Sequence, residues 1–227
     1  MPKPLSVLLC ALALVLGACG DDDDAQPAEK NADSAPPEER GPCKDADQPP
    51  TRDGGTQKKP AQGLDPRKAY EVVLATSCGE FTLLLDQKKS PHATASFVSL
   101  VRNGFYDDTI FHRILPGFVI QGGDPTVTGT GDPGYTTRDP VPANIAYTRG
   151  VAAMAKAGNE PPGTAGSQFI VFTGGDTGLP PEYALLGRVT EGMKTVHAIE
   201  KLGNPASGDE GIPLQSVVIE KATVRER

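Results

Sequence analysis

Tryptophan is absent from this sequence, and its twelve aromatic residues, seven Phe and five Tyr, are all missing from the first 69 positions. Large apolar side chains dominate packed cores, so these 69 residues are not expected to belong to one. All the aromatics fall between Tyr70 and Tyr183. The 158 residues that follow position 69 are long enough to bury a core of their own.

Clusters of basic residues are missing as well. The chain has 22 Lys and Arg against 29 Asp and Glu, a net charge of −7, and no basic stripe, which disfavours nucleic acid as a partner. The G-x-S-x-G motif of many hydrolases does not occur. His92, His112 and His197 lie far apart without the spacing of metal ligands. Gly129–Gly134 fits G-x-G-x-x-G but does not open a helix, so a dinucleotide site is not supported. We expect no metal and no cofactor.

No long hydrophobic run is present either. Leu5–Leu16 is apolar over about 12 residues, which is too short to span a bilayer. Lys3 precedes this run and small residues follow it, as in a secretory signal. The ending Leu16-Gly17-Ala18-Cys19 resembles the bacterial lipobox, whose Cys becomes the lipidated first residue of the mature protein. We predict a signal peptide over residues 1–18 and a lipid anchor at Cys19, which places the protein outside the cytoplasm on a bacterial membrane. An ordinary signal peptide with an incidental Cys19 is the alternative.

Residues 19–68 are of low complexity. Positions 20–68 hold eight Pro and no aromatic residue, and they include the acidic run Asp21–Asp24. Such a composition cannot repay the entropy of ordering. We predict that the lipidated Cys19 is followed by a disordered Pro/Asp-rich tether over residues 19–68. Asp21–Asp24 is interpreted as a solvated charge run rather than a metal site.

Two cysteines, Cys43 and Cys78, would remain after processing. A disulfide between them would persist in an exported protein and would pin the end of the tether to the domain. Two separate thiols are the alternative, because the sequence shows no geometry.

Residues 69–227 carry the pattern of a folded domain. Two β-rich runs, 70–76 and 81–86, are joined by a hairpin signal. A helix is predicted from Pro91, with Ser90 as N-cap and Gly104 after its end. The remaining elements are a second helix ending at Gly203 and short apolar runs at 118–121, 150–155, 167–172, 183–189 and 217–224. This order favours an antiparallel sheet or barrel with two helices over a βαβ fold.

The polar residues that are candidates for ligand recognition are concentrated in two segments, Phe111–Asp124 and Gly166–Phe169. Arg113, Gln121 and Gln168 stand among apolar residues there. An arginine and two amides beside aromatic surface suit recognition of a neutral, peptide-like ligand, and they do not form a nucleophile or a proton relay. The alternative is that Arg113 is a surface charge and the two glutamines cap loops.

The first of these segments closely resembles the signature of the cyclophilin family, in which F-H-R and F-x-I-Q-G-G-D are hallmarks. Further matches are spread from Tyr70 to Arg227, at Gly104–Asp107, Gly129–Gly131, Arg149–Ala155, Gly163–Phe169 and Leu179–Val189. The resemblance implies a mainly β fold, an eight-stranded antiparallel β-barrel capped by two α-helices, over residues 69–227. It also implies peptidyl-prolyl cis–trans isomerase (rotamase) activity, EC 5.2.1.8.

Rotation about an X–Pro amide breaks no bond, although its barrier is about 18–20 kcal/mol. An enzyme must therefore bind the twisted amide more tightly than either planar form. By resemblance, the catalytic residues are Arg113, Phe118 and Gln121, with Arg113 donating a hydrogen bond to the prolyl nitrogen and Gln121 holding substrate backbone. The substrate-binding residues that the resemblance implies are Val119, Ala155, Lys156, Gln168, Ile170, Leu179 and Tyr183.

The chain departs from the best-known members of that family at several pocket positions. Val119 replaces Met, Ile170 replaces Phe, Lys156 replaces Asn and Tyr183 replaces His. Gly178 stands where the family has a Trp associated with cyclosporin binding. We therefore expect weak cyclosporin affinity with isomerase activity retained.

These features together predict a monomeric, membrane-tethered isomerase that assists the folding of exported proteins by acting on their proline-containing segments. The alternative is a binding module of the same fold that retains the proline pocket but has little turnover.

Overall fold

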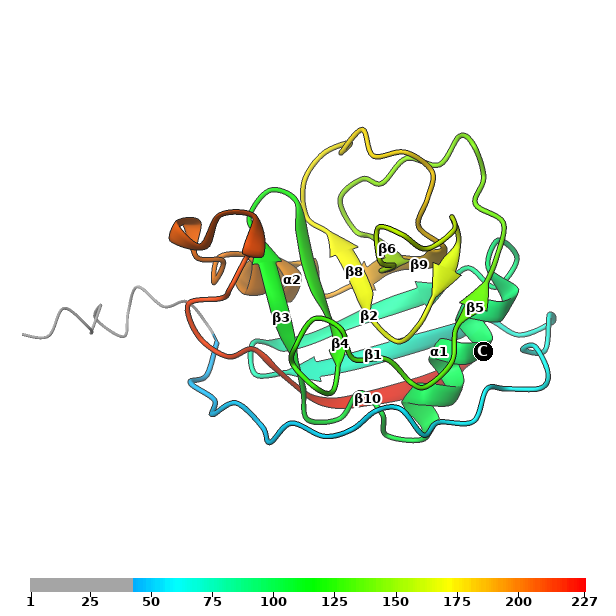
Figure 1. The fold of residues 1–227 in the computed structure, drawn as a ribbon, viewed down its shortest axis with the longest axis horizontal. Helices are drawn as coiled ribbons and strands as arrows, with labels where there is room; N and C mark the ends of the chain where they lie inside the picture. Colours follow the sequence, from blue (N-terminus) through cyan, green and yellow to red (C-terminus); the bar gives the residue numbers. More distant parts are fainter. Residues whose placement is uncertain (1–42) are drawn as a thin grey trace, which may run out of the picture. The chain divides into compact units, whose positions relative to one another are not determined.

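Short runs of β-branched and aromatic residues form strands that close on themselves in the computed structural model, which describes residues 43–227. The predicted signal peptide and Cys19 lie outside the described residues. Eight strands form a closed barrel in the order β1-β10-β3-β4-β8-β6-β9-β2, and every neighbouring pair is antiparallel (Figure 1). The mainly β, eight-stranded barrel expected from the sequence is therefore confirmed.

The elements follow one another in a simple order. The barrel strands are β1 (Tyr70–Thr76), β2 (Gly79–Leu85), β3 (Thr109–Leu115), β4 (Val119–Asp124), β6 (Val151–Met154), β8 (Phe169–Phe172), β9 (Leu185–Glu191) and β10 (Val218–Glu226). A separate two-stranded sheet pairs β5 (Thr137–Arg138) with β7 (Thr164–Ala165). The helices are α1 (Pro91–Arg102), α2 (Met193–Glu200) and the short 3-10 segment η2 (Pro205–Glu210). Among the described residues, no helix combines the length and apolar character needed to cross a bilayer.

Aromatic rings fill the barrel interior. Phe169 is fully buried and meets Phe97, Tyr106 and Phe111 edge to face, with ring centroids 5.5–5.9 Å apart. Phe97 comes from α1, so the helix packs its apolar face against the barrel core. Aromatic pairs of this geometry stabilise a core beyond the area that they bury.

Helix α1 begins at Pro91 and Ser90 occupies its N-cap position, as predicted. Ser90 makes no side-chain capping bond. The buried carboxylate of Asp139 instead accepts hydrogen bonds from the backbone N–H groups of His92 (3.1 Å) and Ala93 (2.7 Å). Asp139 is 47 residues from His92 along the chain, so only the tertiary fold brings the cap to the helix.

We expect Asp139→Ala to lower the free energy of unfolding by about 2 kcal/mol, because two helix N–H groups lose a charged acceptor inside the protein. Asp139→Asn should lose less, since one acceptor oxygen remains. Urea denaturation measures both effects. Asp176→Ala, which removes an acceptor in an exposed turn at Gly178, is the control and should change stability by no more than about 0.5 kcal/mol.

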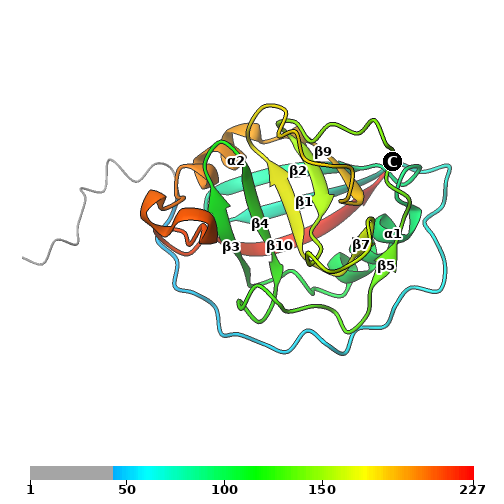
Figure 2. The same ribbon diagram turned by 45° about the horizontal axis from the view of Figure 1, so that its top comes forward.

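Residues 43–68, here called the strap, run along the outside of the barrel. Figures 1 and 2 show this segment, from blue to cyan, passing beside β10 and the green loop that follows β4. Backbone N–H groups of the strap donate to carbonyl groups of the domain, in the pairs Lys44 to Ser77 (2.8 Å), Arg52 to Pro125 (3.0 Å) and Gln57 to Pro133 (3.1 Å). Leu64 also packs against the core. The predicted disordered tether is therefore wrong from Cys43 onward, because these contacts supply the ordering energy that the composition does not reveal.

The start of the strap is joined covalently to the barrel. Cys43 and Cys78 form a disulfide with a sequence separation of 35 residues. Cys78 lies in the tight turn between β1 and β2, where it is buried. Of the two alternatives that the sequence left open, the structure contains the bridge.

Candidate active site

The candidate site lies on the outer face of β3, β4 and β8. Ile120 on β4 and Phe169 on β8 point into the barrel core, while the adjacent Gln121 and Ile170 point out of it, as the alternation of a strand requires. Gln121 pairs with Ile170 across β4 and β8. The site therefore lies on the outside of the barrel, and it is built by residues that alternate along each strand with the residues of the core.

A bulge in β3 places Arg113 on this outer face. Phe111 pairs with Gly122 and Arg113 pairs with Gln121, so His112 is the extra residue in β3. Without the bulge, Phe111 and Arg113 would face the same side of the strand, and the charged side chain would enter the core. With it, Phe111 remains inside and Arg113 stands beside Gln121.

Arg113 begins a chain of hydrogen bonds along the face. Its Nη1 donates to Oε1 of Gln121 (3.4 Å), and Nε2 of Gln121 donates to Oε1 of Gln168 (2.9 Å). Nε2 of Gln168 in turn donates to the carbonyl groups of Gly129 (2.9 Å) and Gly131 (3.1 Å). The structure therefore brings together the three polar residues that the sequence singled out.

The guanidinium of Arg113 is held from two sides. Besides Gln121, it contacts η2, where its Nε donates to the carbonyl of Asp209 (3.2 Å). A Cβ on Gly211 would lie 2.9 Å from Cγ of Arg113, so the absence of a side chain there makes room for the arginine stem. A guanidinium has five N–H donors, and these contacts leave others to bind a ligand.

Beside the arginine stands an apolar cluster separate from the barrel core. It contains six of the predicted site residues, namely Phe118, Val119, Ala155, Ile170, Leu179 and Tyr183. Val119 and Ile170 are buried, so they support the apolar wall from beneath its surface. Phe118 and Leu179 are half-buried and form part of the exposed surface of the wall. The Phe118 ring meets Phe172 edge to face at 6.4 Å.

Tyr147 is a member of this cluster that the sequence reasoning missed. Its ring stacks on Phe172 at 5.1 Å and meets the ring of Tyr183 edge to face. Its hydroxyl donates to the carbonyl of Tyr183 (2.8 Å) and accepts from the N–H of the same residue (2.9 Å). Tyr147 therefore fixes the backbone of Tyr183. Its position two residues before the Arg149–Ala155 match was the available signal.

A pocket of about 280 Å³ adjoins the two glutamines. Ala155 and Lys156 line it, together with the loop Gly129–Asp132. The side chain of Lys156 is only 3% exposed and forms an ion pair with Glu182 (3.0 Å). The N–H of Ala155 donates to the carbonyl of Gln168 (2.9 Å), so this N–H is already bonded within the protein.

His112 is the bulged residue, and its imidazole ring is largely buried. Among the described residues, neither ring nitrogen has a hydrogen-bond partner within normal distance and angle. Burial lowers the pKa of the imidazole, and the nearby Asp124 carboxylate offsets this only in part. The ring is therefore neutral at pH 7 in the folded protein. This suits a residue that orders the bulge better than one that exchanges protons.

The lowered pKa of His112 predicts a loss of stability in mild acid. An exposed imidazole in the unfolded chain has a pKa of about 6.5, so below that pH protons bind the unfolded chain preferentially. The stability linked to His112 is complete above this value and is lost as the pH falls toward the lower folded pKa. We expect His112→Gln to reduce the fall in urea midpoint between about pH 7.5 and 5.5. An unchanged fall would contradict this assignment, and the exposed His92→Gln is the control.

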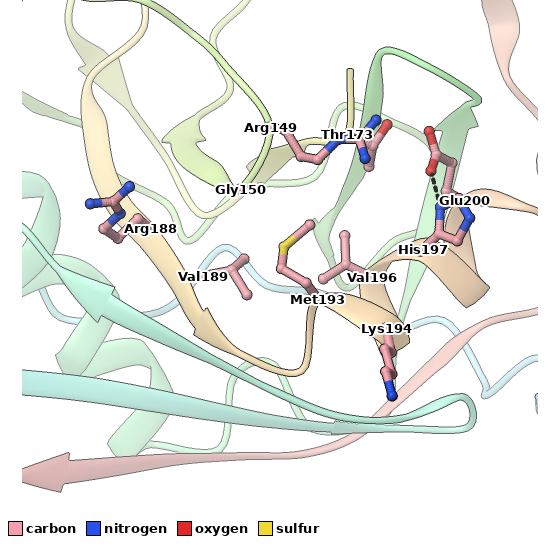
Figure 3. A pocket seen from close by; sticks show the side chains of 10 residues that line it. All are labelled: Arg149, Gly150, Thr173, Arg188, Val189, Met193, Lys194, Val196, His197 and Glu200. Carbon is pink, nitrogen blue, oxygen red and sulfur yellow. Dashed lines mark hydrogen bonds and ion pairs between the residues drawn. The ribbon is translucent and has the colours of Figure 1, made fainter. Parts of the chain in front are cut away.

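A second pocket, of about 410 Å³, lies between β9 and α2 and shares no residue with the Arg113 site (Figure 3). Glu200 lies at its edge, where it accepts from the N–H of Gly117 (2.6 Å) and is paired with Nδ1 of His197 (2.8 Å). Burial acts to raise the pKa of Glu200, but these bonds outweigh it and the pKa is lowered. Glu200 thereby ties α2 to the β3–β4 turn that carries Phe118. Across residues 43–227, no three metal-ligating side chains gather at one point.

A closed antiparallel barrel whose outer face presents an arginine, two glutamines and an apolar wall offers a surface suited to a neutral, peptide-like ligand. Comparison with known families makes this specific. The model described as cyclophilin type peptidyl-prolyl cis-trans isomerase/CLD matches residues 71–224. The chain belongs to the cyclophilin family and is a peptidyl-prolyl cis–trans isomerase.

Individual relatives agree with this assignment. Peptidyl-prolyl cis-trans isomerase-like 1 of Gibberella zeae is 40% identical over 159 residues, covering 68% of this chain and 94% of the relative. Probable peptidyl-prolyl cis-trans isomerase B of Mycobacterium leprae is 36% identical over 192 residues, covering 76% and 64% of the two chains. A cyclophilin-type isomerase of Cryptosporidium parvum superposes with a TM-score of 0.63 at 30% identity, covering 69% and 98%. The predicted family, fold and enzyme class are confirmed.

Proposed function

We propose that the protein accelerates X–Pro rotation in exported proteins at the face described above, with Arg113 as the hydrogen-bond donor to the twisted amide. The observation that carries this proposal is the chain Arg113–Gln121–Gln168 beside the apolar wall that contains Phe118. The proline ring would rest against Phe118 and Leu179, and Gln121 would hold the substrate backbone.

The physical reason lies in the electronic change during rotation. In a planar amide, resonance delocalises the lone pair of the prolyl nitrogen, and twisting restores the lone pair as an acceptor. A donor placed at that nitrogen therefore stabilises the twisted state more than either planar form. Gln121 and the Asp209 carbonyl already orient the guanidinium of Arg113, so little reorganisation is required when the substrate binds.

A protease-coupled assay with an Ala-Pro-Phe peptide tests turnover directly. The protease cleaves only the trans form, so an active isomerase speeds the slow phase in proportion to its concentration. No acceleration at micromolar protein would contradict the proposed turnover and would leave a binding module as the function.

We also propose that the enzyme is a lipoprotein that acts outside the cytoplasm of a bacterium. The sequence signal over residues 1–18 and the lipobox-like Cys19 support this, and so does the Cys43–Cys78 disulfide, since such bonds persist in oxidising compartments. Intact mass of the native protein after membrane extraction tests the anchor. We expect a chain that begins at Cys19 and carries acyl mass, and an unacylated chain would contradict the proposal.

Weak cyclosporin binding is a further prediction. Gly178 occupies a turn with φ +65°, where its N–H is bound by the Asp176 carboxylate (3.1 Å), and it presents no ring to a ligand. We expect inhibition only above micromolar cyclosporin in the same peptide assay. Submicromolar inhibition would show that the missing Trp is not needed for binding.

A further inference from the structure

We propose that the strap is part of the substrate-binding machinery. The loop 125–136 lies between the strap and the candidate site. The strap bonds to the outer side of this loop, and the inner side of the loop holds the Gln168 side chain. This loop is here called the substrate loop. The family model begins at residue 71, so the strap lies outside the segment that the family shares. The inference rests on the proposed substrate face.

The inner side of the substrate loop faces the candidate site. Both N–H groups of the Gln168 amide are bound by loop carbonyls, those of Gly129 and Gly131. Gly129, Thr130, Gly131, Asp132 and Thr136 also line the 280 Å³ pocket. A displacement of the loop would therefore move the Gln168 amide and one wall of the pocket together.

The loop is fixed at its β4 end by a buried carboxylate. Asp124 accepts hydrogen bonds from the backbone N–H groups of Thr126 (2.7 Å), Gly129 (2.7 Å) and Gly131 (3.1 Å). These bonds set the shape of its first half. They do not reach residues 132–136, which must be held by other groups.

The strap supplies hydrogen bonds to the outer side of the loop at three points. Backbone bonds connect Arg52 to the carbonyl of Pro125 and Gln57 to the carbonyl of Pro133, and Nζ of Lys59 donates to the carbonyl of Thr136 (2.9 Å). The strap therefore bonds to the start, the later part and the end of the loop.

Two glycines let the strap and the loop touch backbone to backbone. A Cβ on Gly54 would lie 2.5 Å from Cγ of Pro125 and 2.8 Å from the carbonyl oxygen of Asp132. A Cβ on Gly134 would lie 2.1 Å from the carbonyl oxygen of Gly55. Because Gly54 and Gly134 themselves place no side chain between the two segments, a shift of the strap is passed directly to the loop.

The strap is itself anchored to the barrel independently of the loop. The guanidinium of Arg52 donates to the carbonyl groups of Phe105 and Asp107, in the turn between α1 and β3. The disulfide fixes its start at Cys43. The strap thus works as a rigid brace, and a preorganised loop lowers the entropy lost when a peptide binds.

The test compares three variants of the full chain. Arg52→Ala removes the anchor, and Gly54→Val inserts a side chain between strap and loop. Arg67→Ala is the matched control, because that side chain is 88% exposed and bonds only to Asp65, within the strap, among the described contacts. Each is assayed for isomerase kinetics on a tetrapeptide, for binding of the Ala-Pro dipeptide by NMR titration, and for amide exchange at Gly129 and Gly131.

We expect Arg52→Ala and Gly54→Val to raise KM for the tetrapeptide by about fivefold with a smaller change in kcat, because binding beside the proline is what the loop controls. Amide exchange at Gly129 and Gly131 should quicken, while the affinity for Ala-Pro, which fills only the proline pocket, stays at the value of Arg67→Ala.

Tetrapeptide kinetics of Arg52→Ala equal to those of Arg67→Ala would overturn the inference, as would an equal loss for both ligands, which would indicate general destabilisation. If Gly54→Val does not fold, Arg52→Ala still decides, because it only removes atoms from an exposed residue. The proposed role of Arg113 is tested separately by the kinetics of Arg113→Ala. The proposal for the strap and the proposal for Arg113 can therefore be contradicted independently of each other.

Discussion

Replacement of Arg113 by alanine is expected to lower kcat/KM for X–Pro rotation by about a hundredfold while the barrel stays folded. A hydrogen bond from a charged donor contributes about 1.5–3 kcal/mol, and each 1.4 kcal/mol of transition-state stabilisation is worth about tenfold in rate. The side chain lies on the outer face, and its removal opens no cavity in the core. The loss should therefore appear in rate and not in stability.

Two further variants make this result specific. Arg113→Lys keeps the charge but cannot both bond Gln121 and reach the amide with a planar fork, so we expect it to recover only part of the rate. Arg188→Ala removes an exposed arginine beside the second pocket and should retain full activity. Protease-coupled kinetics and thermal unfolding are measured for each. Wild-type activity in Arg113→Ala would disprove the proposed role of this residue.

Loss of the Cys43–Cys78 bridge is expected to have the largest effect on stability. A disulfide that closes a loop of 35 residues restricts the unfolded chain, and by the chain-entropy estimate its removal costs about 3–4 kcal/mol. For a domain of this size, that corresponds to a fall in Tm of roughly 10 °C. The strap would also lose the fixed point from which it crosses the barrel.

The measurement compares the wild type and the Cys43→Ser/Cys78→Ser double variant, each with and without reductant, by thermal unfolding. We expect reductant to lower the Tm of the wild type to that of the double variant and to leave the double variant unchanged. A wild-type Tm that is insensitive to full reduction, verified by thiol titration, would show that the bridge contributes little.

The elements that depend on local signals could be predicted closely. The first helix begins at Pro91 because proline presets the helical φ and needs no N–H bond there. The hairpin of β1 and β2 follows from two β-rich runs around a tight turn. In both cases the information lies within a few residues, so the sequence alone contains it.

The candidate site was predicted as a set of residues but not as an arrangement. Resemblance to the family picked out Arg113, Gln121 and Gln168, and the structure places them in one hydrogen-bonded chain. The bulge at His112, which turns Arg113 outward, could not be foreseen, because it depends on the register between β3 and β4. Tyr147 was missed for a similar reason, since its role is defined by its contacts with Tyr183 and Phe172.

The strap shows the limit of composition as a guide. Its many Pro and charged residues predict disorder, because they bury little apolar surface. Its order comes instead from backbone hydrogen bonds to partners far along the chain, from Gly54 and from the disulfide. None of these partners can be identified before the barrel is assembled.

The sequence by itself determined the family, the barrel with its two helices, the start of the aromatic-rich segment at Tyr70, and the set of candidate site residues. The resemblance that identified the family and the site residues depends on short motifs such as Phe111–Asp124, and the individual strands and helices depend on local propensity and turn residues, so all of these features are encoded over short stretches. The tertiary structure alone decided that Asp139 caps the first helix, that a bulge exposes Arg113 and that residues 43–68 brace the substrate loop. Each of these rests on contacts between segments far apart in the chain, whose energies exist only once the fold has brought them together.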